Sequence, residues 1–62
     1  MSQRRALGPE DYVYPEKAPG PGSYPIPDRG HAEAALSDCR QDGEQTCADV
    51  RAAIRRKFGV NV

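Results

Sequence analysis

The chain has 62 residues, and its nine basic and nine acidic side chains give a formal net charge of zero at pH 7. This balance gives no global reason to expect nucleic acid or a membrane surface as a partner, and no apolar run approaches the ~20 residues of a membrane-spanning helix. A chain of this length allows one small domain with a thin core, so we expect marginal stability.

The start of the chain is polar. Residues 1–5 read Met-Ser-Gln-Arg-Arg and lack the apolar stretch of a secretory signal peptide, so a cytoplasmic protein is expected, in the host cytoplasm if it is phage-encoded. Gly8 and Pro9 then break any helix. We therefore predict that residues 1–11 form a disordered N-terminus.

Residues 12–27 contain five of the six prolines. The run Pro-Gly-Pro-Gly at 19–22 excludes a helix or a central strand, which indicates an extended arm. The tyrosines Tyr12, Tyr14 and Tyr24 could lie along a helical surface with their hydroxyls in water. Alternatively, the arm could be a ligand for a proline-recognising module. The prolines never form a P-x-x-P pattern, so packing on a helix is preferred.

The first predicted helix has a clear start at the end of this arm. Pro27 biases the residue before it away from the helical conformation, and Asp28 is a strong N-cap candidate whose carboxylate can accept from a first-turn amide. The sequence predicts a helix over 29–41, ended at Gly43 in a left-handed conformation. Four apolar residues follow the spacing of one helix face. They are Ala32, Ala35, Leu36 and Cys39.

The second predicted helix covers 47–58. Thr46, followed three residues later by Asp49, resembles a capping box with Asp in place of the usual Glu. Gly59 is well placed as the glycine that follows a helix C-terminus. The apolar face of this helix consists of Cys47, Val50, Ala53, Ile54 and Phe58.

A connection of about five residues makes the two helices antiparallel neighbours. We therefore predict an all-α fold: a two-helix antiparallel hairpin over residues 28–62, with the extended Pro/Gly-rich arm packed on it. The residues to which this fold assigns capping or packing roles are Asp28, His31, Leu36, Ile54 and Phe58.

Two segments of the chain resemble a known family. They are Tyr24-Pro-Ile-Pro-Asp-Arg-Gly-His-Ala-Glu-Ala-Ala-Leu36, followed by Gly43, and Val50-Arg-Ala-Ala-Ile-Arg-Arg-Lys-Phe58. They are similar to a small uncharacterised domain of actinobacterial and actinophage proteins, whose signature is an aromatic residue followed by P-I-x-D-x-x-H-A-x-x-A-L. Residues 18–22 look like an insertion, and the turn lacks the Thr/Ser-Pro-Glu-Glu start of that domain's second helix. The resemblance implies the helical fold and a phage-like or actinobacterial setting, and it implies no activity.

His31 is the one histidine in the chain. Near a helix start it could act as a base or a metal ligand, since the positive end of the helix dipole favours its neutral form. We prefer a simpler interpretation, in which the ring packs against the arm and one nitrogen is hydrogen-bonded near Asp28. The hydroxyls of Ser23, Ser37 and Thr46 have no partner constellation, so no enzyme activity is predicted.

His31, Cys39 and Cys47 are the candidates for a metal site. His31 and Cys39 are about 12 Å apart along one helix, at ~1.5 Å per residue, so they cannot bind the same metal ion. No metal or other cofactor is predicted.

Cys39 and Cys47 would lie near each other across the turn and could form a disulfide worth roughly 2–3 kcal/mol. For a cytoplasmic protein we prefer reduced thiols, and no base or cation marks either one as reactive.

The charge is unevenly distributed along the hairpin. Residues 31–49 carry five acidic side chains and one arginine, whereas residues 50–62 carry four basic side chains and no acidic one. The four are Arg51, Arg55, Arg56 and Lys57. None of them has an acidic partner within its own helix, so they could form a basic patch for phosphates or an acidic partner. Alternatively, some complement the negative end of the helix or reach Glu33 and Asp28.

These observations predict a small non-catalytic protein-interaction or accessory module, phage-encoded as the resemblance implies. Its partner would be another protein, docked on an exposed helix face or on the arm, because a partner could bury apolar surface that a thin core leaves exposed. The alternative is nucleic-acid binding through the four basic residues, whose few charges give only a modest phosphate footprint. No membrane partner is predicted, and the oligomeric state is left open.

Overall fold

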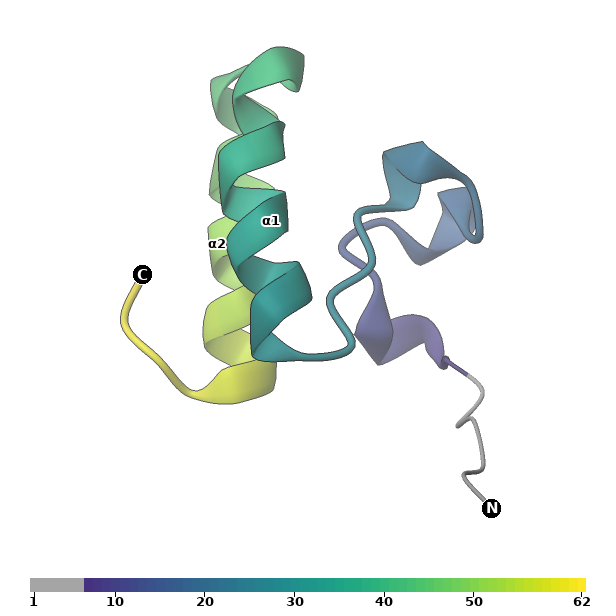
Figure 1. Cartoon of the computed structure of the whole chain (residues 1–62), viewed down its shortest axis with the longest axis horizontal. Coiled ribbons are helices and arrows are strands. Elements are labelled where there is room, and N and C mark those ends of the chain that lie inside the picture. Colours follow the sequence, from purple (N-terminus) through teal and green to yellow (C-terminus); the bar gives the residue numbers. More distant parts are fainter. Residues whose placement is uncertain (1–6) are drawn as a thin grey trace.

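The computed structural model describes residues 7–62, which form two α-helices. Helix α1 spans Arg29–Asp38 and helix α2 spans Glu44–Phe58, with the 3₁₀ turn Cys39–Asp42 between them. The helices lie side by side and run in opposite directions, and the Pro-rich N-terminal segment sits beside them (Figure 1). The predicted all-α fold, a helical hairpin with an N-terminal arm, is confirmed.

Helix α1 begins where the sequence predicts. The carboxylate of Asp28 accepts a hydrogen bond from the backbone N–H of His31 at 2.8 Å. This bond satisfies one of the amides that a first turn leaves unpaired, as expected for an N-cap. The helix ends at Asp38 rather than at residue 41, because the chain tightens there into the 3₁₀ turn.

Helix α2 begins at Glu44, so the predicted start at residue 47 is wrong. Its N-cap is Gly43, whose φ of 104° and ψ of 173° suit glycine rather than a residue with a Cβ atom. Thr46 is inside the helix and donates to the backbone carbonyl of Asp42 at 3.3 Å, so the predicted capping box is absent. Because Gly43 permits this sharp turn, the helix starts one turn earlier than the side-chain pattern predicts.

The C-terminus of α2 is as predicted. Gly59 is left-handed, with φ 69° and ψ 25°, and its N–H donates to the carbonyl of Arg55 at 2.9 Å. The last turn carries basic side chains, which complement the negative end of the helix dipole.

The core lies between the two helices and the arm. Ile26 of the arm and Val50 of α2 are both 0% exposed. The buried apolar residues are Tyr24, Ile26, Ala32, Ala35, Cys39, Val50, Ala53 and Ile54. Those packed against them are Val13, Tyr14, Leu36, Cys47, Phe58 and Val60. The predicted apolar faces of both helices and the packing of the arm are therefore confirmed.

The arm is a folded loop rather than one extended segment. Its 3₁₀ turns are Pro9–Asp11, Pro15–Lys17 and Pro21–Ser23. Each turn begins with a proline, where a missing N–H is tolerated. Between the turns the chain doubles back, since Val13 donates its N–H to the carbonyl of Tyr24 at 3.1 Å and Ile26 donates to the carbonyl of Asp11 at 2.6 Å. The prediction of an extended arm over residues 12–27 is corrected in this respect.

The arm also begins before residue 12. The first 3₁₀ turn ends at Asp11, whose side chain is fully buried. The prediction of a disordered N-terminus is therefore wrong for 9–11, and the part of it that falls on residues 1–6 lies outside the described residues. The arm and the C-terminal tail lie on opposite sides of the hairpin (Figure 1), so one side of the helices is covered by the arm and the other is not.

Candidate functional site

A buried ion pair ties the arm to α2. The side chain of Asp11 is 0% exposed and that of Lys57 is 17% exposed. The Lys57 ammonium donates to the Asp11 carboxylate and, at 2.8 Å, to the backbone carbonyl of Ile26. Asp11 also accepts from the N–H of Gly8 at 2.9 Å. Lys57 therefore holds the arm in place, and its assignment to an exposed basic patch is wrong.

Tyr24 links the arm to the turn between the helices. Its hydroxyl donates to the carboxylate of Asp42 and lies 3.5 Å from the carbonyl oxygen of Asp38. The hydrogen bond to Asp42, followed by burial of the ring, raises the pKa of Tyr24 to about 12. The phenol is therefore a neutral donor over the whole physiological pH range.

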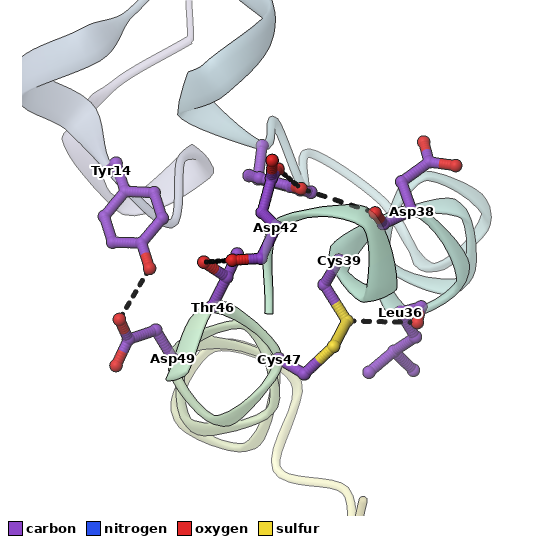
Figure 2. The surroundings of a disulfide bond; sticks show 9 residues. Tyr14, Leu36, Asp38, Cys39, Asp42, Thr46, Cys47 and Asp49 are labelled. Atoms are coloured by element: carbon purple, nitrogen blue, oxygen red, sulfur yellow. Dashed lines mark hydrogen bonds between the residues drawn. A yellow bond between two sulfur atoms is a disulfide. The ribbon is translucent and has the colours of Figure 1, made fainter. Parts of the chain in front are cut away.

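Tyr14 makes a second link, to α2. Its hydroxyl donates to the carboxylate of Asp49 at 2.5 Å (Figure 2). That hydrogen bond, followed by burial, raises the pKa of Tyr14 above its ordinary value. The rings of Tyr14 and Tyr24 meet edge to face with their centroids 6.4 Å apart, and the Lys17 ammonium lies 4.8 Å from the centroid of Tyr14.

The arm tyrosines thus have a structural role. Tyr14 and Tyr24 contact the helices as predicted, but their hydroxyls bond to carboxylates instead of water. Tyr12 is half-buried, and its backbone pairs with that of Pro25 in an isolated β-bridge. Because the arm is folded onto the hairpin through these contacts, it is not presented as an extended proline-rich ligand.

His31 lies beside a surface hollow of about 490 Å³. Its Nδ1 is 2.9 Å from the Asp28 carboxylate, as predicted, but its side chain is 56% exposed, so the predicted packing of the ring is wrong. The N–H of His31, followed by the imidazole hydrogen bond, holds the pKa of Asp28 below its usual value. The described residues that line the hollow include no serine, threonine or cysteine, so His31 has no hydroxyl or thiol of these residue types beside it to activate.

Cys39 and Cys47 form a disulfide with their Cα atoms 5.0 Å apart (Figure 2). The bond joins the turn that follows α1 to the first part of α2, where the sequence places the two side chains close together. Both cysteines are therefore oxidised in the structure. The preference for reduced thiols is overturned in favour of the alternative, the covalent link.

Three arginines of α2 have solvent-exposed side chains. Arg51, Arg55 and Arg56 are exposed, and Arg55 donates to the backbone carbonyl oxygen of Val62 at 2.6 Å. Among the described residues, no aspartate or glutamate side chain forms an ion pair with any of them. The predicted reach of these side chains to Glu33 or Asp28 is therefore wrong.

Within residues 7–62, no group of three His, Cys, Asp or Glu side chains is arranged to hold a metal ion. No helix in this part of the chain is long and apolar enough to cross a membrane.

Sequence reasoning missed the three carboxylates that hold the arm, namely Asp11, Asp42 and Asp49. The available signal was the presence of buried polar donors in need of acceptors, since tyrosine hydroxyls on a packed arm require partners. Spacing alone does not identify those acceptors, because Asp11 and Lys57 are 46 positions apart in the chain.

Comparison of the chain with protein-family models, with curated protein sequences and with solved structures finds no match. The functional argument therefore depends on the side chains described above.

Proposed function

We propose that the protein is a small non-catalytic interaction module that docks on an acidic protein through the exposed face of α2. The observation that carries this proposal is a set of exposed arginines without carboxylate partners among the described residues. We call this set, Arg51, Arg55 and Arg56, together with the exposed Ala52 between them, the arginine face.

The spacing of the arginine face supports contact with a surface. Arg51 and Arg55 are four residues apart and lie one above the other on the helix. Ala52 and Arg56 form a second, adjacent row with the same spacing. Because Ala52 is small, a partner can approach the helix backbone closely while guanidinium groups on either side bond to carboxylates, often with two parallel hydrogen bonds.

Apolar contact makes a smaller contribution to this proposal. The exposed large hydrophobic residues in the described part of the chain are Leu7 and Val62, at 40% and 42% exposure. The apolar hollow beside Leu36 and Phe58 measures about 200 Å³. A large uncovered apolar patch, which was the first motive for a protein partner, is not present among the described residues. Charge therefore replaces apolar burial as the reason to expect docking.

The second candidate is nucleic-acid binding through the same arginine face. It is favoured by the absence of acidic residues from 50–62, which leaves no charge there to repel phosphates. Three phosphate contacts would give a log–log salt slope of about −3 for duplex DNA. Such a footprint supports weak binding that depends strongly on salt.

We also propose that the module is non-catalytic, since the hollow beside His31 is lined by no serine, threonine or cysteine that this histidine could activate. The phage or actinobacterial setting and the cytoplasmic location predicted from the sequence belong to the same proposal. The family resemblance supports the first of these. The second is the default expectation, and the Cys39–Cys47 disulfide counts against it because such bonds are rare in the cytosol.

A photocrosslinking amino acid at Ala52 tests the docking surface in an extract of the native host. Adducts with an acidic protein are expected from position 52, and none from the same amino acid at the exposed Ala34 of α1. The double variant Arg51→Gln/Arg56→Gln should remove the adducts, whereas Arg29→Gln/Arg40→Gln, which removes two charges elsewhere, should retain them. Equal labelling from both positions would contradict the proposal.

Fluorescence anisotropy with short DNA and RNA oligonucleotides distinguishes the second candidate. Binding at low salt that weakens with a slope of about −3 in log salt, and that is lost in Arg51→Gln/Arg56→Gln, would support nucleic acid. No binding at low salt would eliminate it.

A further inference from the structure

The disulfide joins a buried cysteine to a more exposed one. Cys39 is 1% exposed, whereas Cys47 is half-buried and lines a surface hollow of about 810 Å³ at the start of α2. In thiol–disulfide exchange an attacking thiolate must reach one sulfur of the bond, so access influences where the attack occurs. A thiol from solvent therefore meets Cys47 before Cys39.

The same hollow carries positive charge. Arg40 and Arg51 line it, together with one carboxylate, that of Glu44. Guanidinium groups attract an anionic thiol and so raise its local concentration beside Cys47. Cys47 is also within the first turns of α2, where the positive end of the helix dipole acts in the same direction. The sequence marks no cation that would make either cysteine reactive, whereas in the structure two arginines line the same hollow as Cys47.

The buried partner has a hydrogen-bond acceptor available for its reduced form. The sulfur of Cys39 lies 3.2 Å from the backbone carbonyl oxygen of Leu36 (Figure 2). A Cys39 thiol at this place could donate to that carbonyl, so reduction would not leave a buried donor without a partner. The fold can therefore accommodate both oxidation states of this residue.

We propose that Cys39–Cys47 is a thiol–disulfide exchange site for an anionic thiol reductant, with attack at Cys47. This inference does not depend on the proposed docking. The incoming thiolate bonds to the Cys47 sulfur as the bond to Cys39 breaks, and Cys39 leaves as a thiolate that takes a proton from solvent. A second reductant thiolate then attacks the reductant sulfur of the mixed disulfide and releases Cys47. The protein gains two electrons and two protons, and two reductant thiols become one disulfide.

The exchange would also act on the arm. The loop that the disulfide closes includes Asp42, the acceptor for the Tyr24 hydroxyl. Reduction frees this loop, so Asp42 is held less firmly in place to accept the hydrogen bond from Tyr24. Trypsin cleavage after the exposed Lys17 of the arm should therefore be several-fold faster in the reduced protein, approaching its rate in Tyr24→Phe. Equal cleavage rates in the two oxidation states would overturn this coupling.

Glutathione is the probe for the site of attack, because it is a thiol with a net negative charge. Partial reduction of the intact protein, acid quenching and peptide mass mapping should find the glutathione adduct on Cys47. Adducts mainly on Cys39 would overturn the proposal.

The single-thiol variants Cys39→Ser and Cys47→Ser provide a second measurement. With oxidised glutathione, the Cys47 thiol should react about tenfold faster than the Cys39 thiol, because it is more accessible and lies beside the arginines. Circular dichroism reports whether each variant retains its helices. Equal rates in two folded variants would contradict attack at Cys47, and the mapping above decides the question if either variant unfolds.

The arginines are tested by comparing glutathione with cysteamine, a cationic thiol. In Arg40→Gln/Arg51→Gln the ratio of the glutathione rate to the cysteamine rate should fall about tenfold, with a smaller fall at high salt. The matched variant Lys17→Gln/Arg29→Gln removes two exposed charges that do not line this hollow and should keep the wild-type ratio. An unchanged ratio in the first variant, or an equal fall in both, would overturn the role of the hollow.

Discussion

The two sides of the helical hairpin use their charged groups in opposite ways. On the side covered by the arm, the carboxylates of Asp11, Asp42 and Asp49 accept hydrogen bonds from a lysine and two tyrosines. On the exposed side of α2, three arginines have no carboxylate partner among the described residues. A formal net charge of zero conceals this difference, because the acids on the covered side are hydrogen-bonded whereas the arginines on the other side are exposed.

The largest expected effect is on the covered side. Asp11→Ala leaves the Lys57 ammonium without its buried carboxylate and should lower the free energy of unfolding by about 3–5 kcal/mol. Urea denaturation followed by circular dichroism measures this loss, which would leave so small a domain largely unfolded. Combining Asp11→Ala with Lys57→Met removes both charges and should recover part of the stability. A loss no larger than that of Arg51→Ala would abolish the contrast between the two sides.

The disulfide, which joins the turn after α1 to α2, has the next largest expected effect. Cys39→Ala/Cys47→Ala should lower the free energy of unfolding by roughly 2–3 kcal/mol, the chain-entropy value for so short a loop. Thermal denaturation should show a fall in Tm of about 4–8 °C per kcal/mol for a domain of this size. Reduction of the wild-type protein serves as the control and should give a similar shift. A variant as stable as the wild type would contradict this expectation.

Tyr24→Phe should cost about 1 kcal/mol, the usual net value of one hydrogen bond, and should also alter the alkaline pH dependence. The pKa of Tyr24 is about 12 in the folded protein and 10.0 in an ordinary tyrosine. The unfolded chain therefore releases this proton first, and the free energy of unfolding should fall as the pH rises from about 10 to about 12. Denaturation curves across this range should be flatter in Tyr24→Phe. Identical curves would show that the link to Asp42 does not contribute to stability.

The smallest stability effect is expected on the arginine face. Arg51→Gln/Arg56→Gln should change the free energy of unfolding by no more than about 0.5 kcal/mol, because neither side chain is buried or ion-paired. The same variant should lose binding to the partner or to nucleic acid. A large loss of stability would mean that these arginines support the fold, and the two sides would then be alike.

Much of the helical fold follows from local signals. Asp28 marks the start of α1 because an aspartate beyond a proline caps a helix well, and Gly59 marks the end of α2 because glycine adopts the left-handed conformation easily. In both helices the apolar residues recur with the helical period, and this spacing identifies the buried faces. The start of α2 at Glu44 was missed because Gly43 permits a turn that needs no side-chain cap.

The candidate sites were less predictable. Arg55 and Arg56 lie away from the apolar face of α2, so local periodicity is sufficient to find them. Arg51 lies four residues after Cys47 at the edge of that face, and its exposure is seen in the structure. Lys57 differs because it borders that face, and its partner Asp11 comes from a segment predicted to be disordered. Only the docking of the arm turns a basic residue of the helix into a buried ion pair.

By itself the sequence determined the two helices, their antiparallel pairing, their buried faces and the proximity of Cys39 to Cys47. Each of these depends on residues that are close in the chain or that repeat with the helical period. The tertiary structure alone decided how the arm folds back, which carboxylates accept hydrogen bonds from its tyrosines and which cysteine of the disulfide is the more exposed. Tyr24 illustrates the reason. Its φ of 53° is unusual for a residue other than glycine, and it coincides with packing and a hydrogen bond supplied by elements distant in sequence.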